Sequence, residues 1–263
     1  MQLPFFKYHG AGNDFVMLHK PDISHELSRE FVAHLCHRRL GIGADGLIVL
    51  EPHTSYDFYM RYYNADGNEA TMCGNGGRCA VAFARKLGYI GKEAHFLAVD
   101  GPHYASFAAD GEVLLQIQDV SGIQRIGEDV YMDTGSPHLV KFVQDPEQVD
   151  VFAEGKAWRY ARQFQPEGTN VNFIAVDKDY IRMRTYERGV ENETLACGTG
   201  AVASAIAASY TSGSSYRQYR LQARGGVLTV EWEQHDHDHY TNVYLKGPVS
   251  YVFTGIFQDL NKT

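Results

Sequence analysis

The stretch ATMCGNGGRCAVAFARKLG, residues 70–88, places a cysteine and three glycines directly before an apolar-periodic segment. The stretch ETLACGTGAVASAIAASY, residues 193–210, repeats this arrangement later in the chain. The spacing of the apolar residues predicts a helix after each cysteine, and Gly88 is a typical end for the first of them. The chain therefore carries two helix starts of the form Cys-Gly-x-Gly, 124 positions apart.

The residues around these motifs also match, which indicates an internal duplication. RYYNADGNEATMCGNG, residues 61–76, resembles RTYERGVENETLACGTG, residues 184–200, with one residue inserted in the second copy. Further upstream, Gly12 falls opposite Gly135 at an offset of 123. Each copy would span about 125 residues, which is an ordinary size for a domain.

The predicted elements follow the same order in both halves. Aromatic and β-branched residues predict strands within residues 5–10, 14–19, 46–51, 56–64, 103–108 and 112–118, and then within 137–143, 171–176, 180–187, 226–232, 242–247 and 251–257. Helices are expected over residues 24–39 with Ser24 as the N-cap, over 76–88, near 146–160, and after Cys197. The predicted fold class is α+β, with two duplicated lobes in which strands surround helices.

Domain boundaries follow from this duplication. An N-terminal lobe is expected over residues 1–120 and a C-terminal lobe over residues 121–249, each with one of the two cysteine motifs. The last strand, near residues 250–263, could pack back onto the N-terminal lobe. A cleft between two lobes is a usual place for a small ligand.

Composition places the chain among globular proteins. Of its 263 residues, 44% are apolar and 21% are charged, and no apolar run approaches the ~18 residues of a membrane span. The net charge of −8 argues against nucleic acid or an anionic membrane as the main partner. The first residues, MQLPFFKYHGAGNDF, lack the pattern of a signal peptide, so a cytoplasmic protein is expected.

The four cysteines fall into two groups. Cys36 and Cys79 lie among apolar residues and are expected to be small buried hydrophobes. Cys73 and Cys197 stand at the two helix starts, and no CxxC pair is present, so no metal site is predicted.

The two helix starts have a specific chemistry. A helix N-terminus stabilises a thiolate and lowers the pKa of a cysteine placed there. Glycines after the cysteine let backbone N–H groups approach an anion such as a carboxylate. Two acid/base groups on opposite faces of one carbon are what a racemase or epimerase needs. A redox pair is the alternative, although such pairs normally lie close together in sequence.

At these residues the sequence resembles the diaminopimelate epimerase family. The motifs GAGNDF, NADGNEATMCGNGGRC, GSPH, GTNVNF and ERGVENETLACGTG occur in family order over nearly the whole chain. The resemblance implies two pseudo-symmetric lobes, each a barrel-like sheet around a central helix, with the active site in the cleft between them. It implies an isomerase that interconverts LL- and meso-diaminopimelate in lysine and peptidoglycan-precursor biosynthesis, with no metal and no pyridoxal phosphate. A homodimer would be compatible with the resemblance.

The resemblance also assigns site residues. Cys73 and Cys197 would be the two catalytic bases, and His138 and Glu187 would adjust their pKa values. The substrate would be bound by a larger set of polar residues and glycines, namely Asn13, Asn64, Gly74, Asn75, Asn170, Glu187, Arg188, Gly198 and Thr199. An arginine such as Arg188 suits a carboxylate, and amide side chains suit a zwitterion.

Three features depart from the family pattern. Ser136 occupies a position where the family commonly has Asn, so only a weak binding role is expected for it. Gly46 stands where many members have Gln, and no role is carried over to it. The additional residue between Glu187 and Cys197 could alter the geometry of that loop.

Rival interpretations are weaker. GIGADG, residues 41–46, matches a dinucleotide-binding motif, but it follows a predicted helix and precedes a strand, which is the wrong order. HDHDH, residues 235–239, could bind a metal, but its place between two predicted strands favours a solvated hairpin loop. A proline racemase would have His at the position of Asn75. A non-enzymatic protein that binds a small zwitterion would not need paired bases.

Overall fold

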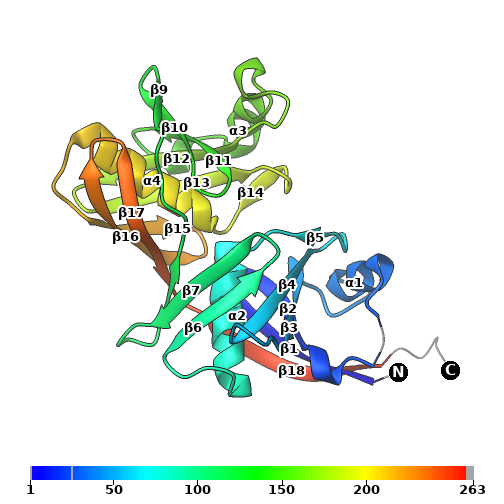
Figure 1. The fold of residues 1–263 in the computed structure, drawn as a ribbon. Helices are drawn as coiled ribbons and strands as arrows, with labels where there is room; N and C mark the ends of the chain where they lie inside the picture. Colours follow the sequence, from blue (N-terminus) through cyan, green and yellow to red (C-terminus); the bar gives the residue numbers. More distant parts are fainter. Residues whose placement is uncertain (1, 25, 259–263) are drawn as a thin grey trace. The chain divides into compact units, whose positions relative to one another are not determined.

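The chain forms two compact units in the computed structural model, which describes residues 2–24 and 26–258. Unit 1 is built from the residues up to Leu115 together with those from Pro248 onward, and unit 2 is Gln116–Gly247. The last strand, β18 (red), lies antiparallel beside the first strand, β1 (blue), and so belongs to unit 1 (Figure 1).

Unit 1 is a mixed sheet in the order β18–β1–β2–β3–β4–β6–β7–β8. Two neighbouring pairs are parallel, β2–β3 and β4–β6, and the other pairs are antiparallel. A short strand, β5, pairs with the end of β4. The bounds are β1 Gln2–Gly10, β2 Asn13–His19, β3 Gly46–Glu51, β4 Phe58–Asn64, β5 Glu69–Ala70, β6 Glu93–Ala98, β7 Gly101–Phe107, β8 Val113–Gln116 and β18 Ser250–Gln258.

Unit 2 repeats this sheet in the order β9–β10–β11–β12–β13–β15–β16–β17. Its parallel pairs are β11–β12 and β13–β15, and the short β14 pairs with the end of β13. The bounds are β9 Gln124–Ile126, β10 Asp129–Asp133, β11 Pro137–Phe142, β12 Asn170–Asp177, β13 Tyr180–Glu187, β14 Asn192–Thr194, β15 Gln218–Ala223, β16 Gly226–Asp236 and β17 His239–Gly247.

The duplication extends to the register of the strands. Across β2–β3, Phe15 pairs with Gly46, and across β11–β12, His138 pairs with Asn170. These matched residues lie 123 and 124 positions apart, at the offsets of the cysteine motifs. The duplicated α+β fold predicted from the motifs is therefore confirmed, and residues of one unit can be compared with their counterparts in the other.

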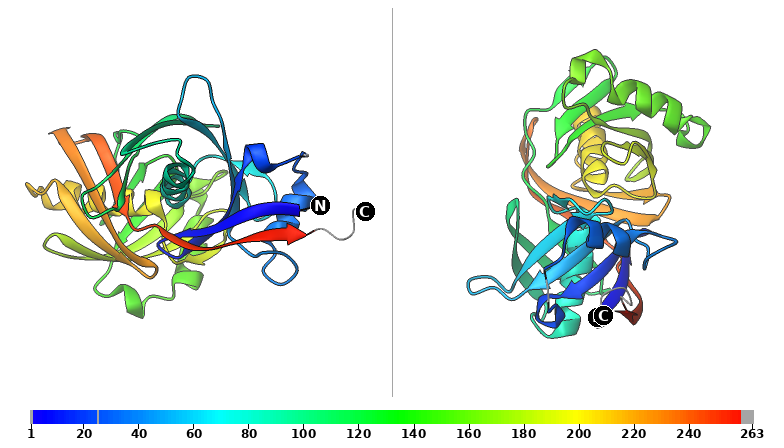
Figure 2. Two further views of the ribbon diagram at one scale, coloured as in Figure 1. Left: turned by 90° about the horizontal axis from the view of Figure 1, so that it is seen from below. Right: turned by 90° about the vertical axis from the view of Figure 1, so that its right-hand side faces the viewer.

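A helix lies inside the sheet of each unit. α2 (Gly74–Leu87) packs against β1, β2, β3 and β4, and α4 (Gly198–Ser212) packs against strands on several sides, from β10 to β17. Figure 2 shows α2 in cyan and α4 in yellow, each surrounded by strands of its own unit. Small residues make this possible in α4, where two thirds of the residues are Gly, Ala or Ser. Each helix ends at a left-handed glycine, Gly88 or Gly213.

The two outer helices begin later than the sequence predicted. α1 is Arg29–Cys36, and its N-cap is Ser28 rather than Ser24. The Ser28 Oγ accepts a hydrogen bond of 3.2 Å from the Phe31 N–H, one turn before the buried face of the helix begins. Both serines satisfy the preference for an N-cap, so residue type alone did not separate them.

The second outer helix differs in the same way. Residues 146–160 were predicted as one helix, but Pro146–Gln148 forms a separate 3-10 turn (η2) and α3 is Val151–Arg159. The Asp150 Oδ1 caps α3 by accepting a hydrogen bond of 3.0 Å from the Ala153 N–H. Two further 3-10 turns are η1 Lys20–Asp22 and η3 Arg162–Phe164.

Several strands were not predicted from the sequence. β6 and β15 are counterparts in the two units, and both alternate exposed and buried residues in the same pattern. Their sequences, EAHFLA and QYRLQA, contain Ala, Glu and Gln, which are poor strand formers. β10 and the short strands β5, β9 and β14 were missed as well.

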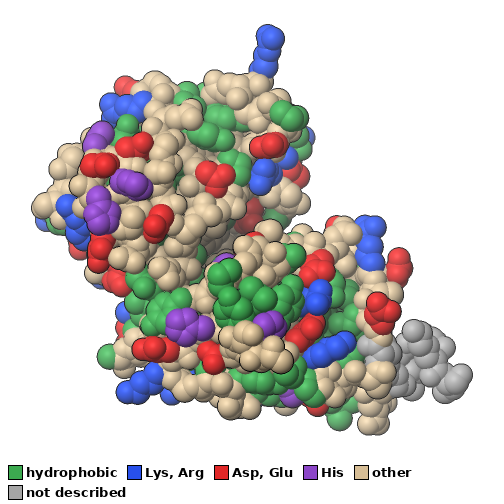
Figure 3. All heavy atoms as spheres, viewed as in Figure 1, with side chains coloured by type: hydrophobic (Ala, Val, Ile, Leu, Met, Phe, Trp, Pro, Cys, Tyr) green, Lys and Arg blue, Asp and Glu red, His purple; other side chains and the backbone are tan. Residues whose placement is uncertain are grey.

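The HDHDH segment is part of a hairpin, as predicted. β16 extends to Asp236 and β17 begins at His239, so the strands run further than expected and the turn is short. His235, His237 and His239 are all exposed. Histidine and acidic side chains gather on the surface of unit 2 at this end of the hairpin (Figure 3). Among the residues that the structure describes, no helix has the length and apolar character needed to cross a membrane.

The correction to α1 gives a direct test. Ser28→Ala removes the capping acceptor and should lower the free energy of unfolding by about 1 kcal/mol in a denaturant titration. Ser24→Ala is the matched control, because Ser24 is exposed and lies outside the helix, and it should change stability by less than about 0.5 kcal/mol. Equal effects of the two substitutions would contradict the assignment of the cap.

Candidate active site: two cysteines at matched helix starts

Each cysteine motif follows an anchored loop. In unit 1, Arg61 on β4 forms an ion pair with Glu69 on β5, with 2.8 Å between Nη1 and Oε1. In unit 2, Arg184 on β13 forms a two-pronged pair with Glu193 on β14, with both N–O distances at 2.7 Å. These pairs fix the strand just before each cysteine. They explain why the matching residues of the two sequence motifs include an arginine and a glutamate.

Cys73 is the N-cap of α2. Its Sγ accepts a hydrogen bond from the Gly76 N–H at 3.2 Å, as a capping serine oxygen would. An added Cβ at Gly76 would lie 3.2 Å from this sulfur and 3.1 Å from Ile48 Cδ1. Glycine is therefore needed for the helix start to lie this close to the sulfur and to β3.

Asn13 completes the Cys73 site, which we define as Asn13, Cys73, Gly74, Asn75 and Gly76. The Asn13 Oδ1 lies 3.9 Å from the Cys73 Sγ and accepts a hydrogen bond from the Asn75 Nδ2 at 3.3 Å. Its Nδ2 donates to Asp45 Oδ2 at 2.8 Å. A carboxylate only accepts hydrogen bonds, so Asp45 fixes the orientation of the Asn13 amide and turns its oxygen toward the sulfur.

Asp45 is itself held by a charged cluster. Arg38 bridges Asp45 and Asp14 at 2.7 Å each, and Lys7 contacts Asp14 at 2.7 Å. The hydrogen bonds from Arg38 and Lys7 hold the pKa of the Asp14 carboxyl well below its usual range, against the opposing effect of burial. This cluster keeps the β1–β2 turn, and with it Asn13, in one position.

Cys197 is the N-cap of α4 but differs from Cys73 in its contacts. It is 6% exposed, and its side chain makes no capping hydrogen bond. Its Sγ lies 3.6 Å from the Thr199 Oγ1, and that hydroxyl lies 2.9 Å from the His138 Nε2. We define the Cys197 site as His138, Asn172, Cys197, Gly198 and Thr199.

The protonation of His138 is fixed by its neighbours. The Asn172 Nδ2 contacts both the His138 Nδ1 at 3.0 Å and the Leu139 carbonyl at 3.4 Å, while the Asn172 Oδ1 accepts from Thr185 Oγ1 at 2.9 Å. A carbonyl only accepts, so the amide nitrogen must face His138, and the His138 Nδ1 must accept. A neutral His138 then carries its proton on Nε2.

Burial keeps His138 neutral. The side chain is inaccessible to solvent, and desolvation together with the charge of Arg188 lowers its pKa to about 3. Its Nε2–H therefore donates to Thr199 Oγ1, and the hydroxyl keeps its own proton, which it can donate to the Cys197 sulfur. The chain Asn172–His138–Thr199 thus presents a hydrogen-bond donor to Cys197.

The residues opposite this chain in unit 1 are different. Phe15 is the counterpart of His138, and Ile48, which pairs with Tyr62, is the counterpart of Asn172, which pairs with Thr185. The same backbone positions are apolar around Cys73 and polar around Cys197. The two thiols consequently lie in different electrostatic surroundings on nearly identical frameworks.

The sequence of this chain matches one family model along both units. The model described as diaminopimelate epimerase matches residues 5–120 and 130–252. Similar proteins named diaminopimelate epimerase come from Flavobacterium psychrophilum, at 44% identity over 95% of this chain and 98% of that protein, and from Chlorobaculum tepidum, at 40% identity over 94% and 98%. The chain belongs to the diaminopimelate epimerase family.

Solved structures with the same fold are more distant. A phenazine biosynthesis protein of the PhzF family from Bacillus anthracis has a TM-score of 0.76 at 13% identity, over 98% of this chain and all of that one. A hydroxyproline epimerase from Agrobacterium vitis has a TM-score of 0.70 at 13% identity, over 97% and 92%. At these identities the likeness supports the two-lobed fold alone.

Asn170 and Arg188 lie together in unit 2 of this family member. The Asn170 Nδ2 donates to Ser136 Oγ at 2.6 Å and to the Pro137 carbonyl at 2.9 Å, and its Oδ1 accepts from the Arg188 N–H at 2.8 Å. Asn170 is 2% exposed, so in this structure it joins the Arg188 loop to the Ser136 turn. The Arg188 side chain is partly exposed and has one long contact of 3.4 Å, to the Glu167 carbonyl.

The other predicted site residues are more peripheral. Asn64 is exposed at the end of β4, where its backbone closes a turn with Gly67 and Asn68. Glu187, its counterpart at the end of β13, accepts a hydrogen bond from Thr194 Oγ1 at 2.8 Å. Thr194 lies just before Cys197, so Glu187 contacts the loop that carries the cysteine.

The side chain of a neighbouring residue, Tyr62, fills the space beside Gly46. A Cβ at this position would lie 2.6 Å from Tyr62 Cε2 and 3.1 Å from the Tyr62 hydroxyl. The Tyr63 carbonyl oxygen would lie 2.7 Å from the same Cβ, so the backbone of β4 also leaves no room for a side chain here. In unit 2 the counterparts of Gly46 and Tyr62 are Asn170 and Thr185, so there the larger residue of the two is on the other strand.

Four residues in or beside the sites were not found by sequence reasoning: Asn172, which belongs to the Cys197 site, and Arg78, Thr185 and Asp45, which bond to residues of the two sites. Asn172 is part of the GTNVNF motif, but only Asn170 of that motif was predicted as a site residue. The signal that would have found Arg78 and Asn172 is polarity at positions that a strand or helix must bury. Cys36 and Cys79 are buried as predicted, and burial raises the pKa of the Cys36 thiol to about 12.

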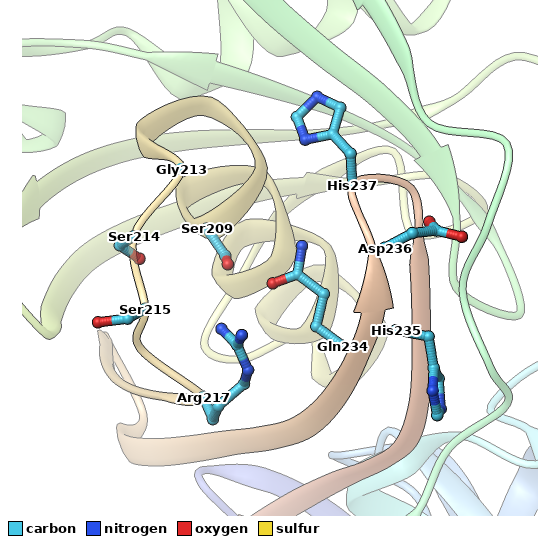
Figure 4. Close-up of a pocket in the computed structure, with 9 residues that line it drawn as sticks. All are labelled: Ser209, Gly213, Ser214, Ser215, Arg217, Gln234, His235, Asp236 and His237. Atoms are coloured by element: carbon cyan, nitrogen blue, oxygen red, sulfur yellow. The ribbon is translucent and has the colours of Figure 1, made fainter.

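A separate polar hollow lies at the other end of α4. It is lined by residues of the last turns of α4, the α4–β15 loop, β16 and the turn after it: Ser209, Gly213, Ser214, Ser215, Arg217, Gln234, His235, Asp236 and His237. In Figure 4 the Arg217 and Gln234 side chains lie beside Ser209, whereas His237 points away from them. Cys197 is at the opposite end of this helix. Within the described residues, no three His, Cys, Asp or Glu side chains are grouped as a metal site would need.

The neutral state of His138 can be tested by its titration. An ordinary histidine has a pKa near 6.5, whereas the pKa of His138 is about 3. Between pH 8 and pH 5 its ring resonances should therefore not shift in an NMR titration. A His138→Gln variant would identify the signal among the 12 histidines of the chain. A midpoint near pH 6.5 would show that the ring exchanges protons with solvent and that the chain to Thr199 is not fixed.

The close approach at Gly200 gives a stability test. A Cβ there would lie 2.4 Å from the Asn172 Oδ1, so Gly200→Ala should displace the amide and cost about 1–3 kcal/mol of unfolding free energy. Gly91→Ala is the control, since no atom lies within 4 Å of its Cβ position. It should be neutral within about 0.5 kcal/mol. A neutral Gly200→Ala would mean that Asn172 is not packed against the helix start.

Proposed function

We propose that this chain is a diaminopimelate epimerase that interconverts the LL and meso forms of its substrate by proton transfer between two thiols. The observation that carries the proposal is the pair of cysteines, each the N-cap of an enclosed helix in one of two duplicated units. The full-length similarity to proteins named diaminopimelate epimerase supports the substrate.

The proposed reaction balances with the two thiols alone. One cysteine, as a thiolate, removes the α-proton of the substrate and becomes a thiol, and the electron pair of the C–H bond stays on the α-carbon. The other cysteine, as a thiol, gives its proton to the opposite face of that carbon and becomes a thiolate. The protein then holds the opposite distribution of protons, and exchange with water restores the first. The proposed chemistry calls for no cofactor.

The hydrogen-bond polarity supports a specific starting state. Cys73 faces the Asn13 Oδ1, which can only accept, so the Cys73 sulfur is best matched as a thiol donor. Cys197 faces the Thr199 hydroxyl, which accepts from His138 and keeps its own proton available to donate to the sulfur. We therefore assign the thiol to Cys73 and the thiolate to Cys197 in the free protein. The roles reverse when the product is converted back.

Charge at the α-carbon needs stabilisation as the proton leaves. The N-terminal turns of α2 and α4 present N–H groups at Gly74, Asn75, Gly198 and Thr199, and these suit the α-carboxylate. Binding the carboxylate there would withdraw charge from the developing carbanion, which is a use of fixed dipoles in catalysis. We assign recognition of the distal amino-acid group to Asn64, Asn170, Glu187 and the partly exposed Arg188.

The need to keep both catalytic cysteines reduced supports a particular location in the cell. A thiolate and a thiol that both turn over must stay reduced, and all four cysteines are free in this structure. We therefore propose a cytoplasmic location, with a small-molecule substrate as the main partner.

The function is tested by cysteine variants and solvent exchange. Cys73→Ser and Cys197→Ser should each lower kcat by at least about a hundredfold, because a hydroxyl is a far weaker acid and base than a thiol. Cys36→Ser is the control, since this residue is buried in a core cluster of unit 1 and belongs to neither site, and it should retain activity. Circular dichroism would verify the fold of each variant. Near-normal activity in either site variant would overturn the two-thiol assignment.

Exchange in D₂O separates this function from its rivals. From LL-diaminopimelate the meso product should carry deuterium at one α-carbon, and LL substrate recovered at early times should carry little. L-Proline should not exchange, because it has no distal group for Arg188 to bind, and that binding energy is expected to support the chemical step. Exchange of proline alone would favour a proline racemase. Deuterium in neither compound would favour a non-enzymatic binding protein.

A further inference from the structure

Arg78 is an unusual residue beside the Cys73 site. It is the fifth residue of α2 and is 0% exposed. Its Nη1 donates to the Gly74 carbonyl at 3.2 Å and its Nη2 donates to the Asn75 Oδ1 at 2.8 Å. Both of these partners are neutral, and among the residues that the structure describes its Nε has no hydrogen-bond partner.

A buried guanidinium with only neutral partners is destabilising. Removing such a charge from water costs several kcal/mol unless an opposite charge compensates it. The duplicated unit shows that the fold does not need it, because Val202 occupies the matched position of α4 and is also fully buried. A requirement of the Cys73 site itself is therefore the better reason for an arginine at this position.

Hydrogen bonds connect Arg78 to the Cys73 sulfur through Asn75 and Asn13. Because a guanidinium only donates, Arg78 binds the oxygen of the Asn75 amide and leaves the Asn75 nitrogen to face Asn13. Asn13 in turn presents its oxygen to Cys73. Gly10 permits this arrangement, since a Cβ there would lie 3.4 Å from the Arg78 Nη2 and 3.0 Å from the Asn75 carbonyl.

The charged groups around Arg78 are few. Cys79 follows it on α2, but burial raises the pKa of that thiol and keeps it uncharged. Glu112, in the turn before β8, and Cys73 are the remaining negative groups that act on the guanidinium, while burial lowers its pKa. Asp100 accepts a hydrogen bond from the Met72 N–H at 3.4 Å and lies on the other side of the cysteine loop.

We propose that Arg78 is a positioning residue for Cys73, which holds the Asn75 side chain at the first turn of α2 and supplies the buried positive charge that stabilises the Cys73 thiolate. The role rests on the proposed proton transfer, in which Cys73 becomes a thiolate after donating its proton. Unit 2 has Val202 at the position of Arg78 and has His138 in its cysteine site, so the two cysteines are adjusted by different means. The hydrogen bonds of the buried guanidinium go to the Gly74 carbonyl and the Asn75 side chain, so it acts through these neighbours and its charge.

The test measures each cysteine separately and needs no turnover of substrate. In a Cys197→Ser background, Arg78→Met should slow alkylation of Cys73 by iodoacetamide about tenfold at pH 7 and raise the pH midpoint of the reaction by about one unit. In a Cys73→Ser background, the same substitution should leave alkylation of Cys197 within about twofold. Arg85→Met is the matched control, because Arg85 lies on the same helix but is exposed.

Mass spectrometry of the alkylated peptides would identify the site, and circular dichroism would verify the fold. An unchanged pH profile of Cys73, or equal changes at Cys73 and Cys197, would overturn the proposal, because the second result is what general loosening of the fold would give. If Arg78→Met does not fold, Arg78→Lys decides, since it keeps the charge but loses the two-pronged donation, and a smaller change confined to Cys73 is expected. Loss of the fold in both variants would assign Arg78 to the framework alone.

Discussion

The structure depends on a helix whose first turn is held inside a sheet. A helix start carries unpaired N–H groups, and these must find acceptors when water is excluded. In both units a cysteine stands at this point, and glycines let the strands approach it. The same constraint that would make a buried helix start costly makes it suitable for binding an anion. The anchoring ion pairs of β4–β5 and β13–β14, the enclosed helices and the glycine contacts all serve to keep that first turn in place.

The direction of the hydrogen bonds is the second feature on which the two sites depend. Carboxylate and carbonyl oxygens only accept hydrogen bonds, and a guanidinium only donates, so each of them fixes the amide beside it. Asp45 does this for Asn13, and the Leu139 carbonyl does it for Asn172. Each fixed amide then determines whether its next partner donates or accepts, where that partner could otherwise do either. Two similar frameworks therefore present opposite hydrogen-bonding groups to two identical side chains.

The sequence predicted the fold better than it predicted the details of the sites. The duplication, the enclosed helices and most strands followed from repeated motifs and apolar periodicity, because these reflect local burial. The start of α1 did not follow, since Ser24 and Ser28 are equally suitable caps. β6 and β15 were missed because their buried positions include alanine, which gives little strand signal. Asn172 and Arg78 could not be placed from sequence, because their roles depend on partners that the fold brings together from other strands or turns.

The close contact between Gly46 and Tyr62 has an evolutionary consequence. The two positions lie on adjacent strands, and the tyrosine ring occupies the space beside the glycine. A larger residue at 46 would overlap this ring, and a smaller residue at 62 would leave a void beside a glycine. Even the two changes together would not make room, because the Tyr63 carbonyl oxygen would lie 2.7 Å from a Cβ at 46. A side chain at position 46 therefore requires a shift of the β4 backbone, and this requirement tends to preserve the glycine in the descendants of this protein.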